Sequence, residues 1–303
     1  MGIPQDAVVG PDSTEAPLVT ICIPHFQVME LMQFCLRAIR QYTDGPKYEV
    51  IVVDTASQDE SLDWLRSVEW IRLIERRDEE LWPQMQAIQD AHEGNPPLWV
   101  LAMNTALDTG LEHARGRYFL IMHSDTIVKQ TGWLTRMVDR LESGEKVGSV
   151  GAMKLEMDSL LTRFLKKSTD TKPLRLWLRR NLLRDERAKP QLKREPCARD
   201  YCALYHTDVL RENKLSFITR GGYSAGEVLH YALKKLGYQT SLIPVREMMG
   251  MMDHIAHATG AIVPELKHAR NRTVNKAQRR LKSLFNRNDV TDLMNAESLD
   301  KLA

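Results

Sequence analysis

A run of apolar and aromatic residues that ends in a polar tip constrains the fold of this chain more than any other segment. Residues 118–122 (YFLIM) are apolar or aromatic throughout, with Gly116 before them and His123, Ser124 and Asp125 after them. A continuous apolar run of this length is typical of a parallel strand that is covered on both faces. In open α/β sheets, ligands bind at the carboxyl ends of such strands. We therefore expect His123, Ser124 and Asp125 to lie at a ligand site.

Strand and helix patterns alternate along the first half of the chain. The expected strands cover residues 18–23, 49–54, 70–74, 118–122 and 146–153, and the expected helices cover residues 29–42, 62–67, 105–115 and 132–141. This order predicts an α/β fold with a single, mainly parallel sheet flanked by helices. Because no GxGxxG motif follows the first strand, a dinucleotide cofactor is disfavoured.

The remaining segments are more mixed. We expect a surface insertion with a short helix at residues 75–97, a strand and a helix within 201–218, a helix at 225–236 and a last strand at 241–245. The expected organisation is a disordered leader at residues 1–16, a main domain at 17–260 with a basic helical insertion at 157–195, and a basic helical extension at 261–303.

Composition bounds the class of protein. The 303 residues are 43% hydrophobic and 27% charged, which is an ordinary globular composition. No run of 18 apolar residues occurs, and the amino terminus lacks the apolar core of a signal peptide. These features predict a cytoplasmic protein.

Positive charge is concentrated in two segments. Residues 161–200 hold 13 Lys and Arg against 5 Asp and Glu, and residues 265–287 are also strongly basic, although the whole chain has a net charge of only +2. Apolar side chains at helical spacing lie beside these charges. The pattern fits solvated helix faces, packing on a partner chain such as a second copy, or peripheral binding to an anionic membrane. The aromatic interleaving of a nucleic-acid reader is missing, so we expect no nucleic-acid partner.

Five motifs in order resemble those of family 2 glycosyltransferases, which have the A-type glycosyltransferase (GT-A) fold. The motifs are IPHFQ at 23–27, VIVVDTASQDES at 50–61, ALDTGLEHARGRYFLIMHSDT at 106–126, GEVLHYALKKLGY at 226–238 and HIAHAT at 254–259. The resemblance implies that the main domain is a GT-A domain that moves a hexose or deoxyhexose from a nucleotide diphosphate sugar to a hydroxyl acceptor. It also implies a glycan or lipid-linked acceptor, as in glycan, glycolipid or cell-surface polysaccharide synthesis. Inversion at the sugar carbon is predicted because a single displacement needs only one base.

The same resemblance assigns roles to individual residues. It implies that the nucleotide sugar is bound by Pro24, His25, Phe26, Asp54, His123, Ser124 and Asp125. Asp125 and His254 would hold Mn²⁺ or Mg²⁺ at the diphosphate, with His257 as a second candidate for the histidine. Glu227 would be the catalytic base. A cation and a base suit this chemistry, because the diphosphate leaves with negative charge and the acceptor must lose a proton.

The chain departs from the family pattern at two of these positions. HSD at 123–125 replaces the usual DxD, and the usual Glu-Asp pair is Glu227-Val228. These departures leave open a catalytically silent sugar-nucleotide-binding protein or a membrane-peripheral scaffold. A nucleotidyltransferase is a further alternative, although residues 24–30 are not the Gly-rich basic loop that a triphosphate requires. As residues alone, Asp125 could simply cap the segment that follows it, and Glu227, near a helix start, could simply complement the helix dipole.

Overall fold

The computed structural model describes residues 7–91, 96–153, 195–219, 223–256, 258–263 and 271–302. The chain divides into a larger unit, Met1–Met153 with Cys197–Ala303, and a smaller one, Lys154–Pro196. Residues 157–194 of the predicted basic helical insertion, and His257, lie outside the described residues. Every helix and strand that the structure describes belongs to the larger unit.

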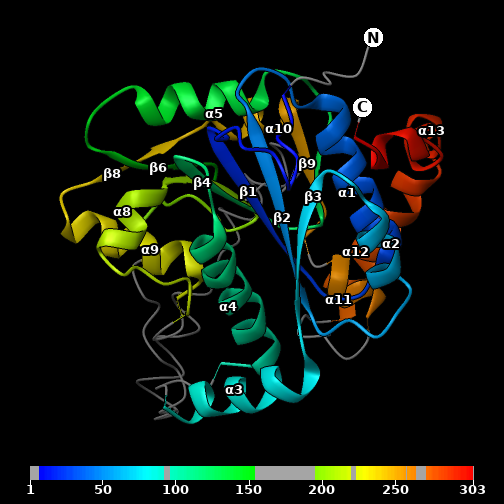
Figure 1. The fold of residues 1–303 in the computed structure, drawn as a ribbon, viewed down its shortest axis with the longest axis horizontal. Helices are drawn as coiled ribbons and strands as arrows, with labels where there is room; N and C mark the ends of the chain where they lie inside the picture. The colour runs from blue at the N-terminus through cyan, green and yellow to red at the C-terminus, as the bar shows by residue number, and fades with distance from the viewer. Residues whose placement is uncertain are drawn as a thin grey trace, which may run out of the picture. The chain divides into compact units, whose positions relative to one another are not determined.

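A sheet of seven strands forms the centre of this unit (Figure 1). In sheet order the strands are β3 (Ile71–Arg76), β2 (Tyr48–Thr55), β1 (Val19–His25), β4 (Tyr118–Met122), β7 (Cys202–His206), β6 (Val147–Gly151) and β8 (Gln239–Leu242). β7 is antiparallel to both of its neighbours, and the other pairs are parallel. The prediction of a mainly parallel α/β sheet is confirmed. A second sheet pairs β5 (Thr126–Val128) with β9 (Met252–His254).

Helices cover both faces of the large sheet. The helices are α1 (Met29–Tyr42), α2 (Ser61–Ser67), α3 (Asp78–Ala91), α4 (Leu98–His113), α5 (Trp133–Glu142), α8 (Thr207–Glu212), α9 (Ala225–Lys235), α10 (Val245–Met251), α11 (Ala258–Ile262), α12 (Asn271–Phe285) and α13 (Asn288–Met294), followed by the 3₁₀ turn η2 (Glu297–Asp300). One core cluster joins Cys22, Phe119 and Ala203 of the sheet to α4, α8 and α9. On the opposite face, Cys202 Sγ lies 3.9 Å from Met137 Sδ of α5. Both faces are therefore apolar, as the continuous apolar strands require.

The N-terminal segment differs from its prediction. Residues 7–16, part of the expected disordered leader, lie against the start of β2, where Val9 N donates to Tyr48 O at 2.7 Å and Tyr48 N donates to Ala7 O at 2.9 Å. The Arg115 guanidinium adds hydrogen bonds to the carbonyls of Gly10 and Ser13. These backbone partners explain why a polar segment without a periodic apolar pattern is ordered here.

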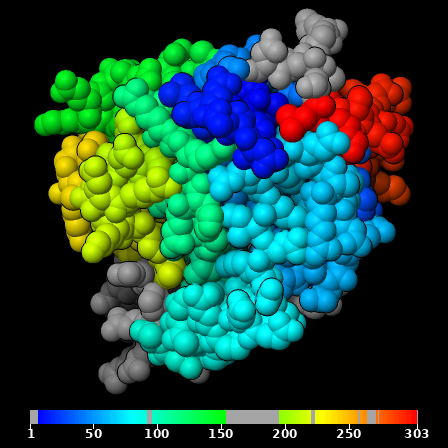
Figure 2. All heavy atoms as spheres, in the orientation of Figure 1, coloured from blue at the N-terminus to red at the C-terminus, as the bar shows by residue number. Residues whose placement is uncertain are grey.

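The C-terminal helices pack on α1, α11 and one another. The apolar stripe of α12 is buried within the protein, at Val274, Ala277, Leu281 and Leu284. Figure 2 shows the blue N-terminal residues beside the red C-terminal ones, and a Cβ added at Gly10 would lie 3.1 Å from Leu302. No helix among the described residues is long and apolar enough to cross a membrane.

Candidate active site

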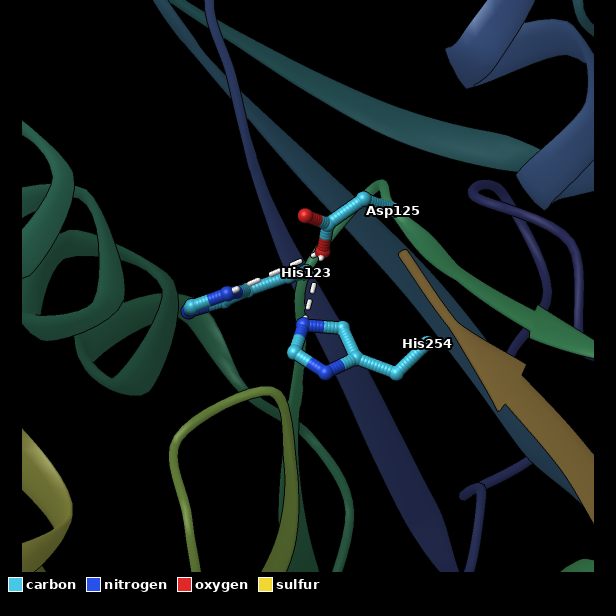
Figure 3. A group of neighbouring side chains, drawn as sticks. All are labelled: His123, Asp125 and His254. Carbon is cyan, nitrogen blue, oxygen red and sulfur yellow. Dashed lines mark ion pairs between the residues drawn. The ribbon is translucent and has the colours of Figure 1, made fainter. Parts of the chain in front are cut away.

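Three side chains converge after the carboxyl end of β4 (Figure 3). His254 Nε2 lies 3.3 Å from Asp125 Oδ1, and His123 Nδ1 lies 4.0 Å from the same oxygen. One potential ligand atom from each residue lies within 4.8 Å of the others. The structure thus brings together the two residues expected to hold a metal, Asp125 and His254, and adds His123 to them.

Strand pairing explains how a distant histidine reaches Asp125. β5 begins at the residue after Asp125 and pairs with β9, so that Thr126 lies opposite His254. The backbone also joins the two segments directly, because Ile255 N donates to Asp125 O at 2.9 Å. The small two-stranded sheet is therefore the element that builds the cluster.

Tyr201 supports both histidines. Its ring stacks on the His254 imidazole, with a centroid separation of 4.5 Å and an interplanar angle of 16°. Its carbonyl accepts hydrogen bonds from His123 N and from Thr126 Oγ1, each at 3.0 Å. The Tyr201 hydroxyl donates to Met153 O at 2.9 Å. No sequence motif pointed to Tyr201; its position just before a strand that pairs with β4 is the signal that could have found it.

The cluster places an ionised carboxylate beside two imidazoles. Burial by itself raises the pKa of Asp125, but His254 and His123 outweigh this effect and hold that pKa below its usual value. The carboxylate is therefore ionised at neutral pH. Among the described residues, the buried atoms His123 Nε2 and His254 Nδ1 have no hydrogen-bond partner, and Asp125 Oδ1 has only its contacts with the two imidazoles. Carboxylate oxygen and imidazole nitrogen are ligands for divalent ions such as Mn²⁺, so the residues fit a metal.

The residues predicted after β1 and β2 also lie together. Pro24 and His25 pair with Val53 and Asp54 across the sheet. Both oxygens of Asp54 accept hydrogen bonds from Ser57, from its hydroxyl at 2.5 Å and from its backbone N–H at 3.0 Å. Burial raises the pKa of Asp54, although these hydrogen bonds oppose the effect. Asp54 is only 1% exposed, so it shapes the loop around Ser57.

His25 is buried as well. Its Nε2 lies 2.8 Å from Ser61 Oγ, and burial lowers its pKa to about 4, although Asp59 opposes the effect. The ring is therefore neutral at pH 7 and adds no positive charge to the site. Phe26, the next residue, is half-buried, as is Ser124.

The two loops also contain strained backbone. Gln27 (φ 53°), Val28 (φ 64°) and Ala56 (φ 59°) have left-handed conformations that residues with side chains rarely adopt. Such strain clusters at ligand sites, where the surrounding structure maintains it. Beside these loops is a pocket of about 390 Å³, whose lining includes Gln27, Val28, Asp59, Glu60 and Ile262. Its acidic lining suits hydroxyl groups or a base better than a phosphate.

Glu227 lies outside the cluster of His123, Asp125 and His254. It is the third residue of α9 and forms a capping box with Ser224, whose backbone N–H donates to Glu227 Oε2 at 2.9 Å. Glu227 Oε1 lies 3.8 Å from Arg199 Nη1, and the residue is 1% exposed. The geometry therefore gives Glu227 a structural role at the start of α9, beside the catalytic role expected from the sequence.

Comparison with known proteins supports the sequence motifs. Residues 101–213, which include β4, His123 and Asp125, match the family described as Glycosyl transferase family 2. The predicted resemblance to family 2 glycosyltransferases is confirmed. No curated protein matches the chain.

Several solved structures of glycosyltransferases are similar to the chain. A mannosyltransferase from Pyrobaculum calidifontis, in complex with GDP-Man and Mn²⁺, is 20% identical, with a TM-score of 0.48 over 97% of this chain and 83% of that one. Glucosyl-3-phosphoglycerate synthase from Mycobacterium tuberculosis, with Mn²⁺ and UDP, is 16% identical, with a TM-score of 0.46 over 89% and 79%. Mouse xyloside xylosyltransferase 1 is 8% identical, with a TM-score of 0.43 over 74% and 84%. Because these identities and TM-scores are low, the roles of individual residues are inferred from the geometry of this chain alone.

Proposed function

We propose that this glycosyltransferase is metal-dependent and moves a hexose or deoxyhexose from a nucleoside diphosphate sugar to a hydroxyl acceptor. The observation that carries the proposal is the convergence of Asp125 and His254 after β4, within the segment that matches the family. A Mn²⁺ or Mg²⁺ ion bound there would neutralise the charge that develops on the diphosphate. Asp125 would hold it through its ionised carboxylate and His254 through Nε2.

The nucleoside would bind beside the loops after β1 and β2. The half-buried Phe26 offers a flat apolar surface, and the acidic lining of the neighbouring pocket, which includes Asp59 and Glu60, can accept hydrogen bonds from hydroxyl groups. Carboxylates repel a diphosphate, so this end of the site suits the nucleoside and the metal cluster suits the phosphates. Pro24, His25 and Asp54 would maintain the shape of these two loops, because all three are buried.

The proposed mechanism is a single displacement with inversion, in which Glu227 takes the proton of the acceptor hydroxyl. Glu227→Gln tests this role well, because glutamine at the third helical position keeps the capping box while it removes the base. We expect turnover to fall roughly 10²- to 10⁴-fold, with nucleotide binding unchanged. NMR of the product gives the anomeric configuration, and retention would exclude this role of Glu227.

The matched control is Glu247→Gln on α10. Glu247 forms an ion pair with Arg136 at 2.5 Å and is partly exposed, so the same chemical change there should leave turnover unchanged. Equal turnover in Glu227→Gln and the unaltered protein would mean that Glu227 only caps α9.

A second candidate is a sugar-nucleotide-binding protein that does not catalyse transfer. It is favoured by the hydrogen bond that Glu227 Oε2 already accepts from the backbone N–H of Ser224. This candidate predicts that nucleotide binds to the protein and that no nucleoside diphosphate is released from any donor, whether or not Glu227 is replaced.

We further propose a cytoplasmic protein that contacts anionic membranes to reach a lipid-linked acceptor. On α12 the apolar stripe packs inside the protein, so contact there would be electrostatic, through exposed side chains such as Arg279 and Lys282. We expect flotation with anionic liposomes at low salt and its loss at high salt. Absence of lipid-dependent flotation at low salt would contradict the proposal.

A further inference from the structure

The metal cluster contains two imidazoles and one carboxylate. Mg²⁺ prefers oxygen ligands and retains much of its water, whereas imidazole nitrogen suits transition ions such as Co²⁺, Ni²⁺ and Zn²⁺. The sequence HSD places a histidine where the family's DxD has its first aspartate. The resulting set of two imidazoles and one carboxylate therefore suits transition ions better than Mg²⁺.

The position of His123 is fixed by its surroundings. Its backbone N–H donates to Tyr201 O at 3.0 Å, and its carbonyl accepts a hydrogen bond from Thr126 N at 3.0 Å. Its imidazole points toward the same oxygen of Asp125 that His254 approaches from another side (Figure 3). Two nitrogens from different directions thus face one carboxylate oxygen, which is an arrangement that a shared cation would stabilise.

His123 is also partly buried. Its side chain is 24% exposed, compared with 9% for Asp125 and 10% for His254. An imidazole at such a depth has limited access to water, and its Nε2 has no hydrogen-bond partner among the described residues. A structural role through side-chain hydrogen bonds is therefore not evident, whereas a ligand role uses the nitrogen that faces Asp125.

We infer that His123 is a third protein ligand of the cation and makes the site select Co²⁺, Zn²⁺ and Mn²⁺ over Mg²⁺. This inference rests on the proposed function, because it concerns the ion that the proposed function requires. It adds a determinant of metal choice within that site. Replacement of His123 by aspartate would return an oxygen ligand to the position and shift the preference toward Mg²⁺.

The inference is tested by measuring metal binding directly, without an assay of turnover. Isothermal titration calorimetry gives the dissociation constants of Co²⁺ and Mg²⁺, each in the presence of the nucleoside diphosphate that binds. We expect the ratio of the Mg²⁺ dissociation constant to the Co²⁺ dissociation constant to fall about 10-fold or more in His123→Asp. Loss of a residue that only supports a metal ligand already lowers metal affinity by about that factor. Pulsed EPR of bound Mn²⁺ should detect two coupled imidazole nitrogens in the unaltered protein and one in His123→Ala.

The outcomes separate this inference from the proposed function. Binding of Mn²⁺ with a single coupled nitrogen, and an unchanged metal ratio in His123→Asp, would overturn the inference and leave the proposed function intact. No binding of any divalent ion, with or without nucleotide, would overturn both. The control is His113→Asn, at an exposed histidine near the end of α4, which should leave the metal ratio and the EPR spectrum unchanged.

Discussion

Replacement of Asp125 by alanine is expected to lower kcat/KM with the nucleotide sugar by about 10³-fold or more at saturating Mn²⁺, which corresponds to about 4 kcal/mol. Asp125 Oδ1 is the one atom that both histidines approach, so its loss removes the centre of the proposed metal site. The fold should persist, because the Asp125 carbonyl still accepts the hydrogen bond from Ile255 N that joins β5 to β9.

Asp253→Ala is the matched control for this prediction. Asp253 is the neighbour of His254 on β9, but its carboxylate pairs with Lys129 at 2.8 Å and is partly exposed. Its removal should leave kcat/KM within a few-fold of the original value. Comparable losses in the two variants would mean that acidic charge near β9, and not a ligand at Asp125, is what catalysis requires.

Replacement of Asp300 by alanine is expected to lower the free energy of unfolding by roughly 3–5 kcal/mol. The two Asp300 oxygens bind the Arg37 guanidinium at 2.9 Å and 2.6 Å, and Trp64 Nε1 donates to one of them at 3.2 Å. The side chain of Arg37 is 4% exposed. Alanine would leave this buried positive charge without its partner, which is more costly than the loss of the ion pair alone. Denaturant titration measures the change.

Asp289→Ala gives the comparison on the same C-terminal segment. Asp289 pairs with Arg287 at 2.6 Å, but the two side chains are 60% and 48% exposed. Removal of this exposed pair should change the free energy of unfolding by less than about 1 kcal/mol. If Asp300→Ala were no more destabilising than Asp289→Ala, the C-terminal turn would not anchor α1, and Arg37 would have to find other partners.

The elements that the sequence predicted well are those with a local cause. The continuous apolar run at 118–122 became β4 with the expected bounds, and the helical spacing at 29–42 became α1. The helix expected at 105–115 begins earlier, at Leu98, directly after the cap residue Pro97. Residues 98–101 (LWVL) are apolar on all sides, so periodicity could not reveal that they are helical.

In the acidic stretch at 75–97, the strand and the helix extend further than the sequence predicted. β3 continues to Arg76, where the guanidinium donates to Thr105 Oγ1 at 2.8 Å and to Ala102 O at 2.5 Å of α4. The short helix expected in this stretch is the 14-residue α3, with Pro83 inside it. Tertiary contacts with α4, such as the shared cluster of Leu81, Met85 and Leu101, override the unfavourable proline.

The sequence predicted only those residues of the candidate site whose position depends on neighbouring residues in the chain. Asp125 follows an obvious strand, and its position at a ligand edge required no long-range information. His254 was placed by motif resemblance, and the pairing that brings it to Asp125 depends on β9, which the apolar run before it concealed. Tyr201 was missed because its role, stacking and backbone acceptance, arises from the pairing of β4 with β7.

The proposed function requires that Asp125 and His254 hold a divalent ion that binds a nucleoside diphosphate. The most direct test is the melting temperature of the protein with UDP, GDP, dTDP or CMP, each with and without Mn²⁺, in the unaltered chain and in Asp125→Ala. Ligand at 100 times its dissociation constant stabilises the native state by about 2.7 kcal/mol. We predict a rise in melting temperature with one nucleoside diphosphate that requires Mn²⁺ and disappears in Asp125→Ala. The same rise with and without Mn²⁺, or in both proteins, would contradict the proposal.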